Sequence, residues 1–417
     1  MAGTAIHFRR RAYCQIIING VDVTHELDPH LISLTVIDGG SPGTDRAIIE
    51  LDDRNGTLPI PANNSRVVVR LGWSSTGPST TAFPAGAKEG IPNLPIPEDG
   101  LPYEGGLQRV FTGGIKDVES GFARRGGGRR LWIEASSANF LEGGKTPKMK
   151  TWGEGEKDDH LNEKAQGTMI PISQVMSEAA KAAGYDFQAS PAMASISRSF
   201  WQQNESFHNL GAKLAQEVGG VFKIKGGTAY LVGMNDGLNV EGKAMPNVTA
   251  EWGKNMISWR IKPWTTRADY ASASRSAFNI AGGAWDTIKK DIEGGFPFGQ
   301  GSATLHLPMP APNKIVAEQT NGGSEQDAMN KRGTGWVVIN GETQAQSLGI
   351  ITIIGARPGV DGQYTMTEVQ HNYTRAGGFT TRCTLANPRF LKYQQNEPPV
   401  AWDKMVGTGT GSGSGEI

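Results

Sequence analysis

The hydrophobic and polar positions of this chain follow a two-residue period toward both ends and a helical period in the middle. Near the start, Tyr13 to Ile18 precede Asn19-Gly20, and Val21 to Thr24 follow. Asn-Gly is a preferred two-residue turn, so this stretch predicts a β-hairpin. Further apolar or alternating runs predict strands at residues 31–37, 47–51, 66–73, 109–118 and 130–135. Together these strands predict a small antiparallel β-barrel over residues 1–145.

A long segment without clear periodicity interrupts this first block. Residues 74–107 carry repeated Pro and Gly, as long surface loops do. Loops of this length are usually functional or disordered. We expect this one to form an arm that contacts a neighbouring chain.

The middle of the chain changes to helical spacing and then back to alternation. Apolar residues recur at Phe207, Leu210, Leu214, Ala215 and Val218, which predicts one amphipathic helix. Asn204 can cap its start, and Gly219-Gly220 can end it. Phe222 and Ile224 then alternate with lysines before a Gly226-Gly227 turn and a second apolar run, which predicts a hairpin.

A second helix is predicted upstream, between Pro171 and Gly184. Its apolar positions are Ile172, Val175, Met176, Ala179 and Ala183. The polar, acidic residues 151–167 come before it. The two helices and the hairpin predict a mixed α/β middle domain over residues 146–239.

Alternation returns in the last third of the chain. Strands are predicted at residues 249–252, 256–263, 271–280, 302–307, 349–354, 364–373 and 379–385, with a short helix at 324–332. The alternation slips by one between Met366 and Val369, which predicts a β-bulge. We therefore expect a second β-barrel over residues 240–392, followed by a flexible tail at 393–417. The predicted fold class is α+β, mainly β, with two small antiparallel β-barrels flanking the α/β domain.

Composition and charge exclude several classes of partner. The 417 residues include 41 Lys plus Arg and 41 Asp plus Glu, so the neutral chain offers no general basic field to nucleic acid or anionic membranes. The sequence shows neither a signal-peptide pattern nor an apolar run near the roughly 20 residues of a spanning helix. We expect a protein folded in a cytoplasm, with no membrane span. Cys14 and Cys383 fit no metal-binding spacing and are predicted to be buried free thiols, with a disulfide as the alternative.

Two motifs resemble catalytic or nucleotide-binding sites but lack essential parts. Residues 39–43 match G-x-S-x-G around Ser41, yet the next residue is Pro42, which has no N–H for an oxyanion hole. Gly144-Lys145-Thr146 resembles the end of a phosphate-binding loop, but Asn139 stands where its first glycine belongs. We therefore expect no catalytic and no cofactor-binding residues.

The acidic and histidine-containing segments do not have the spacing of a metal site. Glu154, Glu156, Asp158, Asp159 and His160 are predicted to lie in a solvated loop, because no turn glycine or ligand spacing accompanies them. Residues 52–56 are predicted to form a polar turn, and His371 is predicted to pack in a barrel wall. No metal site is expected.

One basic cluster remains, at a predicted hairpin tip. Arg124-Arg125 and Arg129-Arg130 are separated by three glycines. They form either a solvated turn or a surface for a negatively charged partner. The interleaved aromatic residues typical of single-strand nucleic-acid binding are missing, so sequence-specific nucleic-acid recognition is not expected.

Several segments, taken in order, resemble the phage late-control D family, the baseplate hub proteins of contractile tails. They are the N-terminal hairpin, IIELDDRNGTLPIP, VVVRLGW, FTGGIKDVES, RRLWIEASSANFL, the helix and hairpin at 204–232, and VDGQYTMTEVQHNYTRAGGFTTRCTL. The likeness extends over most of the chain, from residue 10 to residue 390. Residues 74–107 and 151–167 depart from it.

The resemblance implies a structural role rather than an enzymatic one. Hubs of this family are homotrimers with two similar barrels in each chain, so that six barrels form a pseudo-sixfold ring. One end of the ring matches the hexameric tail tube or a tube initiator, and the other seats the trimeric tail spike. The tape measure protein and the baseplate wedge are further implied partners. The implied location is the tail baseplate of a virion, assembled in the host cytoplasm.

Two other classes compete with this interpretation. A carbohydrate-binding adhesin needs exposed Trp or Tyr side chains gathered on one face, whereas the ten tryptophans are dispersed along the sequence. A cell-wall glycan hydrolase needs two carboxylates held at a fixed separation, and the sequence singles out no such pair.

Overall fold

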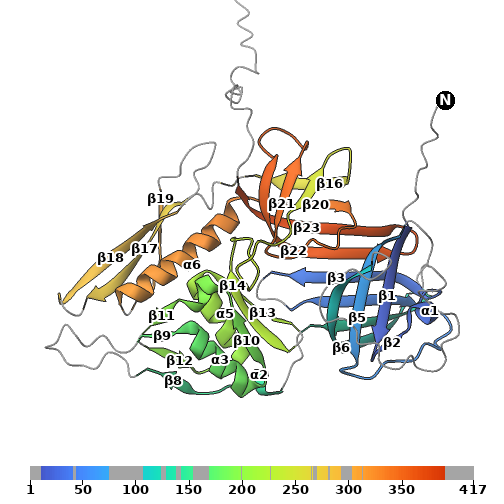
Figure 1. Cartoon of the computed structure of the whole chain (residues 1–417), viewed down its shortest axis with the longest axis horizontal. Coiled ribbons are helices and arrows are strands. Elements are labelled where there is room, and N and C mark those ends of the chain that lie inside the picture. Colours follow the sequence, from blue (N-terminus) through green and yellow to red (C-terminus); the bar gives the residue numbers. More distant parts are fainter. Residues whose placement is uncertain are drawn as a thin grey trace, which may run out of the picture.

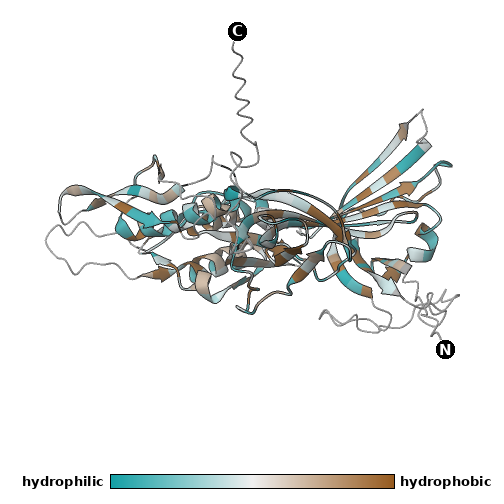
Figure 2. Cartoon of the chain, turned by 90° about the horizontal axis from the view of Figure 1, so that it is seen from above, coloured by the Kyte–Doolittle hydropathy of each residue, from teal (hydrophilic) through white to brown (hydrophobic). Residues whose placement is uncertain are grey.

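The computed structural model describes residues 11–40, 44–74, 107–123, 128–137, 142–153, 169–198, 200–225, 227–263, 265, 270–279, 282–292, 303–311 and 313–389. These residues form a mainly β structure, as predicted from the sequence. Its apolar side chains gather in separate clusters. The molecule is elongated (Figures 1 and 2). The predicted loop at 74–107, apart from its end residues, and the C-terminal tail lie outside the described residues.

The first β block is an antiparallel sheet that curls around one apolar cluster. Its strand order is β3-β4-β7-β6-β5-β1-β2. The predicted hairpin is confirmed: Ile18 pairs with Val21, and Asn19 and Gly20 have φ angles of 50° and 83°. The strands are β1 (Arg11–Ile18), β2 (Val21–Asp22), β3 (Leu31–Gly39), β4 (Arg46–Asp52), β5 (Arg66–Ser74), β6 (Leu107–Ala123) and β7 (Gly128–Ser136), with the short helix α1 (Thr24–Leu27) after β2.

The middle unit packs two helices against a three-stranded sheet. Helices α3 (Ile172–Ala183) and α5 (Phe207–Val218) confirm the two predicted amphipathic helices, and Gly184 and Gly219 end them in the left-handed conformation. The predicted hairpin is formed by β13 (Gly220–Lys225) and β14 (Thr228–Gly233). The remaining elements are α2 (Glu142–Lys145), α4 (Pro191–Ala194), β8 (Lys150–Trp152), β9 (Ile170–Pro171), β10 (Asp186–Ala189), β11 (Ser197–Arg198) and β12 (Trp201–Gln203).

The predicted cap of α5 was wrong by two residues. Ser206, not Asn204, is the N-cap, and its hydroxyl accepts a hydrogen bond from the backbone N–H of Asn209 at 3.4 Å. Both residue types are good caps. The apolar pattern fixes the helix face but not its first turn, so it did not distinguish them.

The second β block contains the C-terminal strands. They are β15 (Val248–Glu251), β16 (Met256–Lys262), β20 (Thr334–Asn340), β21 (Ile350–Ile354), β22 (Gly362–Thr374) and β23 (Gly378–Arg389). The predicted bulge is confirmed by a register shift between Met366 and Glu368. Phe379, Thr381, Cys383 and Leu385 all point into buried surroundings, as their alternation predicted.

The two β blocks are parts of one sheet rather than two closed barrels. β3 pairs with β22 antiparallel, from Ser33 opposite Thr374 to Gly39 opposite Glu368. Among the described strands, no pairing closes β1 onto β3 or β15 onto β16. The expectation of two separate barrels was therefore wrong. β3 pairs with β22 of the second block rather than with β1, which would have closed the first block.

Side chains from the second block complete the core of the first. Tyr373 and Phe379 belong to the same buried cluster as Leu34 and Ile49. The indole of Trp73 lies 5.9 Å from the ring of Phe379 and donates a hydrogen bond to the carbonyl of Gly341 at 2.8 Å. The shared core and the shared sheet therefore join the two β blocks.

A separate lobe stands at the end of the molecule opposite the first β block (Figure 1). It consists of β17 (Tyr270–Asn279), β18 (Ala284–Asp291) and β19 (Ala303–His306), with α6 (Lys314–Arg332) packed on this small sheet. The predicted helix at 324–332 was too short, because α6 begins ten residues earlier, after the N-cap Asn313. Gly322 and Gly323 in its centre weaken the helical signal in the sequence.

Candidate functional site

The structure places the earlier site candidates in unremarkable surroundings or outside the described residues. Ser41, Arg124-Arg125 and the acidic run at 154–160 lie outside them. Asp53 in the predicted polar turn accepts hydrogen bonds from the backbone N–H groups of Thr57 and Leu58, so its carboxylate stabilises the turn. Arg130 of the basic cluster pairs with Glu50 on the neighbouring strand. Among the described residues, no group of His, Cys, Asp and Glu side chains has the arrangement of a metal site.

His371 and the two cysteines are buried, as predicted. His371 lies against Thr381, with 3.1 Å between Nδ1 and the hydroxyl, and burial lowers its pKa to about 4. Cys14 and Cys383 are free, and burial raises the pKa of each thiol to about 12. Thiols in this state are poor nucleophiles. These groups belong to the core rather than to a reactive site.

The most unusual polar cluster lies where the middle unit meets the two β blocks. Lys223 on β13 forms ion pairs with Asp38, at the end of β3, and with Asp45, just before β4, the latter at 2.6 Å. Asp38 also accepts hydrogen bonds from the backbone N–H and the hydroxyl of Ser347, at 3.0 and 2.6 Å. All three charged side chains are largely buried. One cluster thus ties together three segments that are distant in sequence; we call it the lysine junction.

The charges of the lysine junction are interdependent. Burial alone raises the pKa of Asp38, but Lys223 and Lys225 oppose this and hold it well below its usual range. Burial, followed by the nearby Asp38 carboxylate, raises the pKa of Asp45. Burial opposes ionisation of Lys223, yet the two carboxylates raise its pKa. Removing the ammonium would leave two buried carboxylates close together, which is strongly unfavourable.

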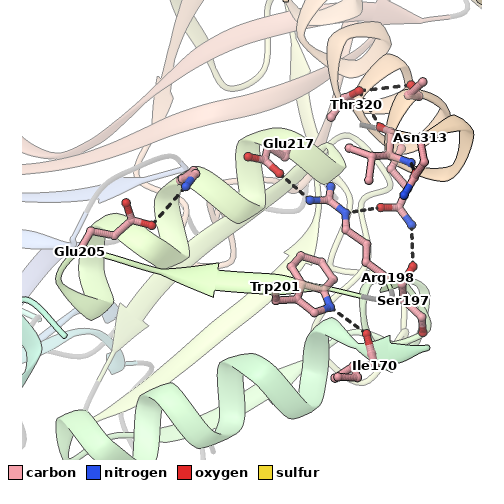
Figure 3. A network of polar contacts seen from close by, with 12 residues as sticks. Ile170, Ser197, Arg198, Trp201, Glu205, Glu217, Asn313 and Thr320 are labelled. Carbon is pink, nitrogen blue, oxygen red and sulfur yellow. Dashed lines mark hydrogen bonds and ion pairs between the residues drawn. The ribbon is translucent and has the colours of Figure 1, made fainter. Parts of the chain in front are cut away.

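A second polar network connects the middle unit to the lobe (Figure 3). Arg198 on β11 donates hydrogen bonds to Glu217 of α5 at 2.8 Å and to Gln319 of α6 at 2.7 Å. Gln319 in turn donates to the carbonyl of Ser197 at 3.1 Å, and the guanidinium lies 4.5 Å from the ring centre of Trp201. We call this group the arginine junction.

Sequence reasoning found neither junction. Lys223 occupies a polar position in a correctly predicted hairpin, where a solvated lysine is the ordinary expectation. Asp38 and Asp45 lie on β3 and just before β4, and their approach to Lys223 depends on contacts between segments that are distant in sequence. A buried lysine leaves no signal in the alternation of a single strand.

Exposed strand edges and aromatic side chains offer surfaces for assembly. β18 pairs only with β17 among the described strands, and seven of its eight residues are exposed. Trp285 on β18 is 61% exposed and packs against Phe278 at 5.2 Å between ring centres. A second exposed aromatic, Trp252, contacts Trp259 at 5.0 Å. Exposed edges are natural docking sites for another chain.

In the described part of the chain, no helix is both long enough and apolar enough to cross a membrane.

Comparison with known proteins identifies the fold. The sequence matches no protein-family model and no curated protein. The structure is similar to the 43 kDa tail protein of prophage MuSo2 from Shewanella oneidensis, with a TM-score of 0.58 and 10% identity, covering 90% of this chain and 98% of that chain. A tail protein from Neisseria meningitidis MC58 gives a TM-score of 0.57 and 12% identity, covering 90% of this chain and 96% of that one.

A third solved structure shows the same likeness. Prophage tail protein gp18 from Listeria monocytogenes EGD-e gives a TM-score of 0.50 and 8% identity, covering 90% of this chain and 94% of that chain. At such low identity the likeness concerns the fold alone. The chain therefore has the fold of these tail proteins over nearly its whole length and nearly the whole length of each of them.

Proposed function

We propose that this chain is the structural baseplate hub of a contractile tail, located in the tail baseplate of a virion. The observation that carries the proposal is the full-length likeness of its fold to tail proteins, with nine-tenths of this chain and almost all of theirs aligned. The order of sequence motifs that resembles the late-control D family points in the same direction. In this role the chain is a trimeric, non-enzymatic adaptor between the hexameric tail tube and the trimeric spike.

The architecture is consistent with a structural role in an assembly. Each chain has two β blocks joined through β3 and β22, so three chains would offer six β blocks to a sixfold partner. The lysine junction fixes the middle unit to both halves. We propose the division of the chain at residues 145, 239 and 392, with the exposed edges forming the contacts between copies.

Native mass spectrometry of the purified full-length chain tests the proposal. A hub predicts a species at three times the 44.6 kDa of one chain, alone or after addition of a spike protein from the same tail. A monomer under both conditions would contradict the adaptor role. Assays for glycan binding and peptidoglycan hydrolysis would then test the two competing classes.

A further inference from the structure

The lobe is an insertion into a β-hairpin. β16 and β20 are antiparallel neighbours, and Lys262 at the end of one pairs with Thr334 at the start of the other. The whole lobe, from β17 to α6, lies between these two strands in the sequence. Its two connections to the second β block therefore meet at one place, beside Pro263 and Gly333, where a Cβ on the glycine would lie 2.5 Å from the carbonyl oxygen of Pro263.

The lobe has apolar contacts of its own. Ala277 and Ile288 of the sheet pack with Ala317 and Val316 of α6. Asn321 of α6 donates a hydrogen bond to the carbonyl of Ile288 at 2.9 Å, and Glu325 pairs with Lys290 at 2.8 Å. The helix is thus attached to the lobe sheet by apolar, hydrogen-bonded and ionic contacts.

The contact between the lobe and the middle unit is of a different kind. It includes the arginine junction, a hydrogen bond from Asn235 to Gln326 at 3.1 Å, a hydrogen bond from the Asn330 amide to the sulfur of Met234 at 2.8 Å, and a close approach of Gly323 to the end of α5. The apolar cluster of the lobe shares no residue with those of the middle unit. By contrast, Val221 and Val232 of the middle unit share a cluster with Leu348 of the second β block.

Several buried polar atoms in this contact have no hydrogen-bond partner among the described residues. They are one terminal nitrogen of Arg198 and the side-chain oxygens of Asn235 and Asn330. A buried polar atom without a partner destabilises the state that buries it. Separation of the lobe would let water reach all three atoms. Polar interfaces of this kind are typical of units that move relative to one another.

We propose that the lobe detaches from the middle unit as one piece, turning about its two connections at Pro263 and Gly333 while β16 and β20 stay paired. Arg198 holds the docked state, because its guanidinium connects Glu217 on one side of the contact with Gln319 on the other. Detachment opens the end of α5 and one face of α6. The device is independent of the hub assignment, since it depends only on contacts within one chain.

Distance measurements between spin labels test this device on the full chain. Labels are attached to cysteines introduced by Lys213→Cys on α5 and Lys289→Cys on β18, both exposed sites. The native thiols are buried and do not compete for the label. A second pair within the lobe, Lys289→Cys with Lys331→Cys, reports whether the lobe itself stays intact.

The test variant is Gln319→Ala. It removes the lobe's partner of Arg198 but leaves Glu217 in place, so the middle unit keeps its own ion pair. Loss of a hydrogen bond to a charged group is expected to raise the ratio of detached to docked molecules by about tenfold or more. Arg198→Ala should raise it further, whereas Lys150→Ala, which breaks an exposed ion pair with Glu178, should not change it.

The expected result is a second, longer distance between α5 and β18 in Gln319→Ala, with an unchanged distance within the lobe. The proposal is overturned if Gln319→Ala is folded and shows the single docked distance of the unaltered chain. It is also overturned if the distance distribution within the lobe broadens together with the distribution between α5 and β18. The lobe would then be unfolding rather than detaching.

Discussion

The ammonium of Lys223 on β13 lies 2.6 Å from the carboxylate of Asp45, a residue that precedes β4 in the first β block. The same ammonium pairs with Asp38, which also binds Ser347 of the second β block. A single lysine of the middle unit therefore contacts, directly or through one carboxylate, both halves of the shared sheet. The lysine junction therefore connects the middle unit to both β blocks.

Replacement of Lys223 by Met should destabilise the protein strongly. Two buried carboxylates would lose their nearest counter-charge and keep only the half-exposed Lys225, 3.5 Å from Asp45. Breaking a buried ion pair costs about 3–5 kcal/mol. Urea unfolding at neutral pH measures the change. Asp45→Asn in the same chain should recover part of the loss, because it removes one of the stranded charges.

The control for this experiment is Lys243→Met. Lys243 forms an ion pair with Glu241, and both side chains are mostly exposed. Exposed pairs contribute little to stability. Equal losses for Lys223→Met and Lys243→Met would show that the lysine junction does not hold the units together.

Stability should fall in mild acid because of His371. Burial lowers its pKa in the fold to about 4, from 6.5, and nearby Asp38 only partly opposes this. Unfolding therefore takes up a proton between these two values, and the free energy of unfolding decreases as the pH falls through that window, by about 1.4 kcal/mol per pH unit. His371→Gln, which keeps a hydrogen-bonding side chain beside Thr381, should show a flatter dependence in urea titrations. If the free energy of unfolding depended on pH equally in both proteins, His371 would not be the cause of the loss in acid.

Two adjacent glycines of α6 should respond in opposite directions to Ala. A Cβ on Gly323 would lie 2.6 Å from the carbonyl oxygens of Gln216 and Glu217, whereas one on Gly322 would meet only the flexible end of Lys290 at 3.3 Å. Gly323→Ala should cost about 1–3 kcal/mol through overpacking. Gly322→Ala should be neutral or stabilise by up to about 1 kcal/mol, the ordinary helix preference. The melting temperatures of both variants measure these changes. Equal shifts in melting temperature would contradict the close contact between Gly323 and the end of α5.

The start of α5 offers a test of the capping residue. Ser206→Ala removes the acceptor for the N–H of Asn209 and should cost about 1 kcal/mol. Asn204→Ala should leave stability unchanged within about 0.5 kcal/mol, as is usual for exposed sites. Denaturant midpoints of the two variants compare them directly. A larger loss of stability for Asn204→Ala than for Ser206→Ala would indicate that Asn204 caps the helix, as the sequence alone suggests.

Local patterns predicted much of this fold because local chemistry determines it. Asn19-Gly20 specified the first hairpin, Gly184 and Gly219 specified the helix ends, and the slip after Met366 marked the bulge. In each case the signal and the structure lie within a few residues of each other.

The features that the sequence did not reveal depend on contacts between distant segments. Nothing near Ser33 indicates that it pairs opposite Thr374, so the fusion of the two β blocks was missed. The predicted helix was shorter than α6 because Gly322 and Gly323 interrupt the helical pattern. Gly323 is small enough for α6 to pack closely against α5. Lys223 and Arg198 resemble surface residues until the fold brings their partners to them.

The central claim is that three copies of this chain form a ring of six β blocks. Negative-stain class averaging of the purified chain, alone and with its spike protein, tests it most directly. The account predicts a threefold ring in which six peripheral densities, one for each β block, surround a channel. Particles that are monomeric in both samples, with no ring and no complex, would contradict it.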